Sequence, residues 1–561
     1  MATTVTKPIR LPARVTLAAA PGRATVLVAV AAGLLTLLLR LAMHTRSFDL
    51  FGDEVIYADM GRGVMSGGFP RYTGQVFFLN GPAFFYLEAA WAHLLGSPAT
   101  LMGRVFQARA LNSLFAAVTA SALVLLATRA ASLRAGVAAG LLFALEPFCA
   151  RQNDRALLET SMMLWVALGY LLYTHLISHP PAAGGGRLRA VGAGLLFGCA
   201  ALTKDEGTLL TVVPLLAATG LRWGARRGLT LITVGTTVAV YVSYVAVVAA
   251  CGYFTAFWQA KTTGLQRMLG LIQVSGFHSA GGGSLTARLL SEASYFGTTY
   301  VLLIAAVAAG FVVFRRGGQV ARLLGLVYIS AVLALGYALT LGTLEEQELY
   351  LLVVPSLLII PVAATLLPGV RTLAVAALAV ILAINLATSV DWLVRPDNGF
   401  ARALAYITAH VPRGANITDA AVGPAGDIGQ NALADYGYHA GLWVTPAARA
   451  RQHVSYVLVP WAEVDEGYSD LSPAQVRQLT GQGRQVFSFH GRTFGDLALY
   501  RLPPAARDVT RTASHRAIAG KSASGTRFAH EAWPGTTGGA GRPRRQPAAG
   551  RRRPPDARRP A

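Results

Sequence analysis

Residues 24–43 have the sequence ATVLVAVAAGLLTLLLRLAM, and Gly52-Asp53-Glu54 follows them closely. A helix of about 20 apolar residues crosses the hydrocarbon core of a bilayer, so this run predicts a first membrane span. The segment before it is basic, which keeps an N-terminus in the cytoplasm; its charges are Lys7, Arg10, Arg14 and Arg23. The acidic pair Asp53 and Glu54 is therefore predicted to lie on the outer side, at the membrane surface.

The rest of the chain is also strongly apolar. Of its 561 residues 53% are hydrophobic, and the mean hydropathy is +0.47. Hydropathy predicts about 11 spans, near residues 24–43, 110–127, 135–149, 156–176, 190–203, 207–221, 228–250, 296–314, 321–342, 349–367 and 372–390. With an odd number of spans and a cytoplasmic N-terminus (1–23), the C-terminal part is predicted to lie outside. The predicted fold class is a polytopic all-α membrane domain over residues 24–391.

Charged residues are sorted between the two sides of the predicted topology. The predicted inner loops are basic and contain no acid; their charges are Arg129, Arg134, Arg187, Arg189, Arg222, Arg226, Arg227, Arg315, Arg316, Arg322 and Arg371. Basic bias on short loops sets orientation, so this pattern supports the topology. Acids gather instead on predicted outer segments and outer helix ends. Because acids contribute little to orientation, their one-sidedness indicates a polar working face on the outer side.

The formal charge of +22 does not indicate nucleic-acid binding, because much of the excess lies in the C-terminal tail and in the predicted inner loops. From Ala505 onward, 13 Lys or Arg and 3 Asp or Glu contribute +10. Residues 505–561 are rich in Pro, Gly and Arg and poor in apolar residues, which predicts a disordered basic tail. Such a tail either contacts anionic lipid or envelope polymer, or is solvated without a specific role.

Two outer loops and one soluble domain complete the predicted organisation. The loop 44–109 contains two predicted surface helices, Asp53–Ser66 and Pro82–Leu95, and the loop 251–295 contains another at Phe254–Leu271. Residues 395–504 change character: a helical pattern at 400–410 precedes strand-like runs at 416–418, 453–459, 485–490 and 497–502. This pattern predicts a small extracytoplasmic α/β domain.

Several motifs on the predicted outer side occur in a characteristic order. After the acidic pair come Arg109-Ala-Leu-Asn-Ser-Leu-Phe115, RQNDRALLE over 151–159, Leu202-Thr-Lys-Asp-Glu-Gly207, and Gln347-Glu-Leu-Tyr350 leading to Pro355. In this order residues 25–390 resemble the GT-C membrane glycosyltransferases, the superfamily of protein mannosyltransferases and aminoarabinose transferases. The resemblance implies transfer of a sugar from a polyprenyl-phosphate donor to a protein, lipid or glycan acceptor, with inversion at the anomeric carbon.

Such a transfer needs a base for the acceptor hydroxyl and positive charge for the departing phosphate. The resemblance implies that Asp53 is the base, with Glu54 beside it as a second catalytic candidate. The alternative is that both acids merely begin a helix, where negative charge is favourable. The pair could also share a divalent cation. The segment Leu79-Asn80-Gly81 departs from the charged residue that relatives often carry there, so the sequence leaves a metal undecided.

Four basic residues are candidates for contact with the donor phosphate: Lys204, Arg109, Arg151 and Arg155. An ammonium meets phosphate as a compact point charge, whereas a guanidinium offers paired donors. Two of the four have a simpler alternative. Lys204 could pair with its neighbours Asp205 and Glu206, and Arg109 could anchor a helix at the membrane interface.

The candidates for lining the substrate cavity are Glu159, Glu206, Glu346, Glu348 and Tyr350. A carboxylate one turn inside a span, such as Glu159, is costly unless it is paired or faces a wet cavity. Its local partner would be Arg155, four residues earlier. Glu346 and Glu348 could instead belong to an ordinary acidic loop.

Two other functional classes remain alternatives. A transporter or flippase of lipid-linked sugars would also be polytopic, but it should show internal repeats and ionisable groups near the bilayer midplane. A non-catalytic envelope scaffold would use the α/β domain for binding and would need no reactive carboxylate. The composition, high in Ala, Gly and Arg, favours a bacterial plasma (inner) membrane.

Overall fold

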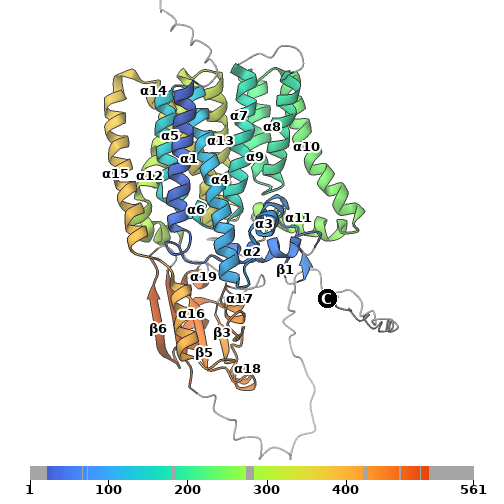
Figure 1. Ribbon diagram of the computed structural model, residues 1–561, viewed down its shortest axis with the longest axis vertical. Helices are drawn as coiled ribbons and strands as arrows, with labels where there is room; N and C mark the ends of the chain where they lie inside the picture. Colours follow the sequence, from blue (N-terminus) through green and yellow to red (C-terminus); the bar gives the residue numbers. More distant parts are fainter. Residues whose placement is uncertain are drawn as a thin grey trace, which may run out of the picture. The chain divides into compact units, whose positions relative to one another are not determined.

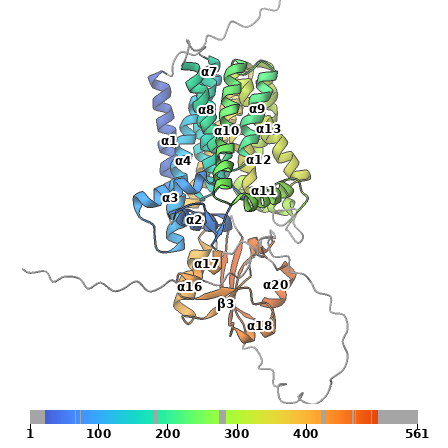
Figure 2. The same cartoon turned by 90° about the vertical axis from the view of Figure 1, so that its right-hand side faces the viewer.

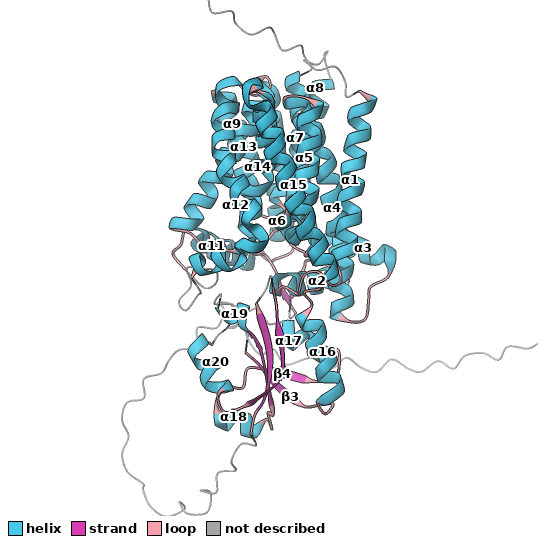
Figure 3. Cartoon of the chain, turned by 90° about the vertical axis from the view of Figure 1, so that its left-hand side faces the viewer, coloured by secondary structure: helices cyan, strands magenta, loops and turns pink. Residues whose placement is uncertain are grey.

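The computed structural model describes residues 22–65, 67–72, 74–178, 185–272, 284–420, 428–465, 469, 471–492 and 495–503. These residues belong to one compact unit, Met1–Ala513. They form a helical bundle and a smaller mixed α/β domain (Figures 1 and 3). The predicted tail 505–561 lies outside the described residues, as does nearly all of the predicted N-terminal segment.

Within the described part of the chain, eight helices are long and apolar enough to cross a membrane. They are α1 (Arg23–Met43), α4 (Leu101–Ala130), α7 (Leu158–Ser178), α10 (Arg227–Ala250), α12 (Leu285–Arg316), α13 (Gln319–Thr340), α14 (Tyr350–Thr365) with the 3-10 turn η1 (Glu346–Leu349), and α15 (Arg371–Val394), which follows η2 (Pro368–Val370). Each predicted apolar run coincides with helix. The predicted number of spans is not confirmed, because the remaining bundle helices are short or bent.

The short bundle helices are α5 (Leu133–Leu145), α6 (Pro147–Asp154), α8 (Gly185–Ala201) and α9 (Gly207–Gly220). Helices α5 and α6 meet at a 60° bend. Proline lacks a backbone N–H, so α5 cannot continue through Pro147. The carboxylate of Glu146 caps the new helix by accepting a hydrogen bond from the backbone N–H of Cys149 at 2.6 Å. The bend brings the polar sequence 151–155 into the interior of the bundle.

Surface helices gather at one end of the bundle, here called the α2 end. They are α2 (Gly52–Met65), α3 (Ala83–Leu95) and α11 (Phe254–Met268), with a two-stranded ribbon of β1 (Arg71–Tyr72) and β2 (Gln75–Val76) (Figures 1 and 2). Large apolar side chains on α3 and α11 remain exposed, among them Leu94, Trp258 and Leu265. Such faces suit the membrane–water interface. The three helices coincide with the predicted loop helices to within a few residues.

The soluble domain is built on a five-stranded sheet of order β4-β3-β5-β7-β6. Its strands are β3 (Asn416–Asp419), β4 (His439–Gly441), β5 (Tyr456–Pro460), β6 (Arg484–His490) and β7 (Asp496–Arg501), and its helices are α16 (Gly399–His410), α17 (Ile428–Ala434), α18 (Pro446–Arg451), α19 (Trp461–Asp465) and α20 (Pro473–Thr480). Strand β3 is parallel to β4 and β5, whereas β7 is antiparallel to β5 and β6. The predicted helix and four strand-like runs correspond to α16, β3, β5, β6 and β7, whereas β4 and the short helices α17 to α20 were not predicted.

Two carboxylates join this domain to the α2 end. Asp49 accepts hydrogen bonds from the backbone N–H of Phe400, at the start of α16, at 3.1 and 3.2 Å. Asp435 accepts one from the N–H of Leu101, at the start of α4, at 2.5 Å. Unpaired N–H groups at helix starts favour such acidic partners. The apolar residues Leu50 and Leu404 belong to one core cluster that spans both parts.

Candidate active site

Asp53 lies in the first turn of α2, where its carboxylate is only partly exposed. Its Oδ2 atom accepts hydrogen bonds from the hydroxyl of Tyr57 at 3.4 Å and from the Nε2 of Gln347 at 3.3 Å. The pKa of Asp53 is raised to about 7, chiefly by burial and then by the carboxylates of Glu345 and Glu159, against the opposing charges of Lys204 and Arg267. A carboxylate with a pKa near 7 is suited to act as a general base.

Lys204 lies between α8 and α9 and faces the same region. Its Nζ is 2.6 Å from the Oε1 of Glu159 and 3.9 Å from the Oε1 of Glu206. Burial alone would lower the pKa of Lys204, but the carboxylates of Glu159, Glu206 and Glu348 hold it well above its usual value. Lys204 is therefore a fixed positive charge. Glu159 pairs with this lysine rather than with the Arg155 that its sequence spacing suggested.

The loop that carries Lys204 is fixed against the first outer loop by backbone contact. A Cβ at Gly81 would lie 2.1 Å from the carbonyl oxygen of Leu202, so no other residue fits there without displacement. The N–H of Ala83 donates to that same carbonyl at 3.0 Å. The segment Asn80-Gly81 thus places α3 against the loop 202–206, close to Lys204. Lys261 of α11 holds the same two segments together, with its Nζ 2.6 Å from the Oδ2 of Asp205 and 3.0 Å from the carbonyl oxygen of Leu79.

Arg151, in α6, and Arg155, directly after it, belong to a second charged cluster. The Nη1 of Arg151 is 3.0 Å from the Oε1 of Glu292, and its Nη2 pairs with Glu346. The Nη1 of Arg155 is 3.9 Å from the same Glu346. Arg288 joins both acids, at 3.1 Å from Glu292 and 3.5 Å from Glu346. The cluster therefore concentrates three guanidinium groups around two carboxylates.

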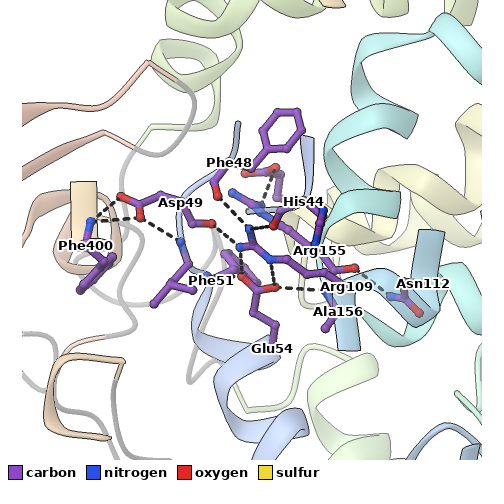
Figure 4. A network of polar contacts seen from close by, with 12 residues as sticks. His44, Phe48, Asp49, Phe51, Glu54, Arg109, Asn112, Arg155, Ala156 and Phe400 are labelled. Carbon is purple, nitrogen blue, oxygen red and sulfur yellow. Dashed lines mark hydrogen bonds and ion pairs between the residues drawn. The ribbon is translucent and has the colours of Figure 1, made fainter. Parts of the chain in front are cut away.

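Glu54 and Arg109 form a closed ion pair in the interior (Figure 4). Both side chains have an exposed fraction of 0%. The Nε of Arg109 donates to Glu54 Oε2 at 2.8 Å, and its Nη atoms donate to the carbonyls of His44, Phe48 and Asp49 at 3.0, 2.9 and 2.9 Å. Glu54 also accepts from the N–H groups of Phe51 and Ala156. Arg109 is thus no interfacial anchor, and the pair ties α2 and α4 to the chain after α6.

The remaining predicted residues border these groups. Tyr350, at the start of α14, donates a hydrogen bond to the Oδ1 of Asn153 at 2.6 Å. Glu206 occupies the position before α9 without a capping hydrogen bond from its side chain, and Glu348 is near enough to Lys204 to raise the pKa of that lysine. Sequence reasoning did not assign Tyr57, Arg288 or Gln347 to the site, although Gln347 opens the quoted motif that ends at Tyr350. Tyr57 lies four residues from Asp53, whereas Gln347 meets Asp53 from 294 positions away, which no local pattern reveals.

Within the described ranges, no group of three or more His, Cys, Asp or Glu side chains is arranged to hold a metal ion. Glu54 directs both oxygens to Arg109 and to backbone N–H groups, whereas Asp53 contacts Tyr57 and Gln347. The two neighbouring acids therefore do not converge on one shared ion.

Comparison with known proteins supports a common architecture. Residues 88–263 match the family described as dolichyl-phosphate-mannose-protein mannosyltransferase. The structure of ArnT from Cupriavidus metallidurans bound to undecaprenyl phosphate superposes with a TM-score of 0.54 at 15% identity, covering 85% of this chain and 97% of that chain. No match was found among curated protein sequences.

A second similar structure is the archaeal oligosaccharyltransferase AglB from Archaeoglobus fulgidus, in complex with an inhibitory peptide and a dolichol-phosphate. It superposes with a TM-score of 0.50 at 12% identity, covering 84% of this chain and 74% of that chain. The family match and both structures agree with the resemblance inferred from the order of motifs. This multi-pass membrane protein therefore has the GT-C fold of the membrane glycosyltransferases.

Proposed function

We propose that the protein is a membrane glycosyltransferase that moves a sugar from a polyprenyl-phosphate donor to an acceptor hydroxyl. The observation that carries this proposal is the placement of Asp53, a carboxylate with a pKa near 7, beside the fixed cation Lys204. The similar proteins add chemical support, because their descriptions name dolichyl-phosphate-mannose, undecaprenyl phosphate and dolichol-phosphate. A base and a phosphate-binding cation at one membrane-proximal site are what this transfer requires.

In the proposed reaction, the acceptor hydroxyl gives its proton to Asp53 while its oxygen attacks the anomeric carbon. The bond between that carbon and the phosphate oxygen breaks, and the polyprenyl phosphate leaves with the electron pair. Attack from the face opposite the phosphate inverts the configuration and needs no covalent intermediate. Lys204 stabilises the negative charge that develops on the leaving phosphate.

The predicted site residues have three different tasks in this scheme. We assign Lys204, oriented by Glu159, to the phosphate, with Arg151 and Arg155 as further positive charge deeper in the bundle. We assign Glu206, Glu348 and Tyr350 to the side that receives the sugars, and Glu346 to the orientation of the arginines. We assign Glu54 and Arg109 a supporting role, because their hydrogen bonds tie α2 and α4 to the segments before α2 and after α6.

We further propose that the α2 end faces the extracytoplasmic side. The arginine-rich loops of the sequence follow the opposite helix ends, for example Arg129 and Arg134 between α4 and α5, and Arg315 and Arg316 at the end of α12. Short loops with this bias stay in the cytoplasm. The α/β domain would then lie outside, where it borders the acceptor side of the site.

The pH dependence of transfer tests the role of Asp53. A base acts in its deprotonated form, so the single-turnover rate should rise as the pH increases through about 7 and then level off. The measurement is the rate in purified protein from about pH 5 to about pH 9. A rate that is flat across this window, or that falls as the pH rises through 7, would contradict the assignment.

A further inference from the structure

We propose that Gln347 is a positioning residue that holds the carboxylate of Asp53 by bridging it to Glu345. The inference rests on the proposed function, since it assigns Gln347 a role in setting the catalytic base. Gln347 lies in the short turn η1 immediately before α14, and its exposed fraction is 3%. It is thus an enclosed amide with a fixed backbone on both sides.

One nitrogen atom makes both bridging contacts. The Nε2 of Gln347 donates to Asp53 Oδ2 at 3.3 Å and to Glu345 Oε2 at 2.8 Å. A primary amide carries two N–H donors on that nitrogen, so the two bonds use its full donor capacity. The flipped amide would direct its carbonyl oxygen at two carboxylates, and an ionised carboxylate has no hydrogen to donate to it. The contacts therefore fix the amide orientation as well as its position.

The far side of the bridge is anchored to the surface helix α11. Glu345 pairs with Arg267, whose Nη2 lies 2.9 Å from the Oε1 of Glu345. The hydroxyl of Thr343 donates to the backbone carbonyl of Arg267 at 2.8 Å. Gln347 is consequently held by a chain of contacts that begins outside the reaction centre. These contacts fix the position of its amide independently of Asp53.

This arrangement assigns different tasks to the two oxygens of Asp53. Tyr57 and Gln347 both donate to Oδ2, from opposite elements of the fold. Oδ1 is then the atom that takes the proton of the acceptor hydroxyl. The charged groups that face Asp53 are Glu345, Glu159, Lys204 and Arg267, so two acids oppose its ionisation and two cations favour it. The amide of Gln347 adds a neutral donor that stabilises the ionised form.

The test compares Gln347→Leu with the wild-type protein in the full-length chain. Loss of the donor favours the neutral carboxyl, so the rising limb of the pH–rate profile should move up by about one pH unit. At pH 7 the rate should fall about fivefold, because the deprotonated fraction of the base drops from about one half to about one eleventh. It should recover at high pH because the deprotonated base returns. Gln347→Glu adds a third carboxylate and should move the limb further in the same direction. Gln319→Leu, at the other end of the bundle, is the matched control and should leave the profile unchanged.

Two results would overturn the inference. One is a Gln347→Leu profile that coincides with the wild-type profile. The other is a rate that falls equally at every pH together with a lower unfolding temperature, which is the signature of a structural role alone. The outcome is separable from the proposed function. If the wild-type protein transfers no sugar, infrared titration of Asp53, measured as the difference from Asp53→Asn, still decides whether Gln347→Leu raises its midpoint.

Discussion

Asp53→Asn is expected to reduce glycosyl transfer by about 10³-fold, within the range of a lost general base. Asparagine has nearly the same shape and can still accept hydrogen bonds from Tyr57 and Gln347 through its carbonyl oxygen. The change removes a negative charge from a site where burial already disfavours the ionised carboxylate. The protein should therefore remain in the membrane at its normal level and unfold at nearly the same temperature. Product formation by the purified variant measures the effect.

Asp59→Asn is the matched control, because Asp59 lies on the same helix. Its side chain is 42% exposed and its carboxylate is 3.8 Å from Arg104, away from the contacts of Asp53. Its transfer rate should stay within about twofold of wild type, as expected for an exposed ion pair. Equal losses in both variants would indicate a general effect on α2. If the protein were a non-catalytic scaffold, neither substitution should change its function.

Arg109→Ala is expected to destabilise the protein by about 3–5 kcal/mol, because it leaves Glu54 as an unpaired charge in the interior. The substitution also leaves the carbonyls of His44, Phe48 and Asp49 without their donor. Arg104→Ala is the control on the same helix, since its contact with Asp59 is long at 3.8 Å and the side chain of Asp59 is 42% exposed, so its loss leaves no buried charge. The measurement is the unfolding temperature in detergent together with the amount of protein in the membrane.

The double variant Glu54→Leu/Arg109→Met shows whether Arg109→Ala affects transfer only by leaving an unpaired buried charge or also by removing a contact with substrate. Replacing a buried pair by apolar residues of similar volume is often nearly neutral, so much of the stability should return. If Arg109 only supports α2, transfer should return with it. A double variant that folds normally but has no activity would instead indicate direct contact of Arg109 or Glu54 with substrate.

The positions of the helices could be predicted from the sequence more accurately than the number of membrane spans. Long apolar runs identify helices by composition alone, and α1, α10 and α15 match their predicted ranges within a few residues. The run 135–149 was different, because Pro147 divides it into two helices at a 60° bend. Strand β4 was missed because His439–Gly441 has only three residues and no alternating pattern.

Partner choice in the site could not be predicted from local spacing. Glu159 and Arg155 are four residues apart, which would make them neighbours on a continuous helix. However, α6 ends at Asp154 and α7 begins at Leu158, so Arg155 lies outside both helices. Glu159 instead meets Lys204 from a distant loop. The residue types were enough to suggest a base and its cations, whereas their pairing depends on tertiary packing.

The most direct test of the account is to incubate purified protein with a panel of labelled polyprenyl-phosphate sugars and an acceptor extract. The account predicts selective release of polyprenyl phosphate from at least one donor, abolished by Asp53→Asn. The double variant Lys204→Met/Glu159→Gln, which leaves no lone buried charge, should lower that release by about 10²-fold. Release that is unaffected by both variants, or absent for every donor in the panel, would contradict the assignment of this site to glycosyl transfer.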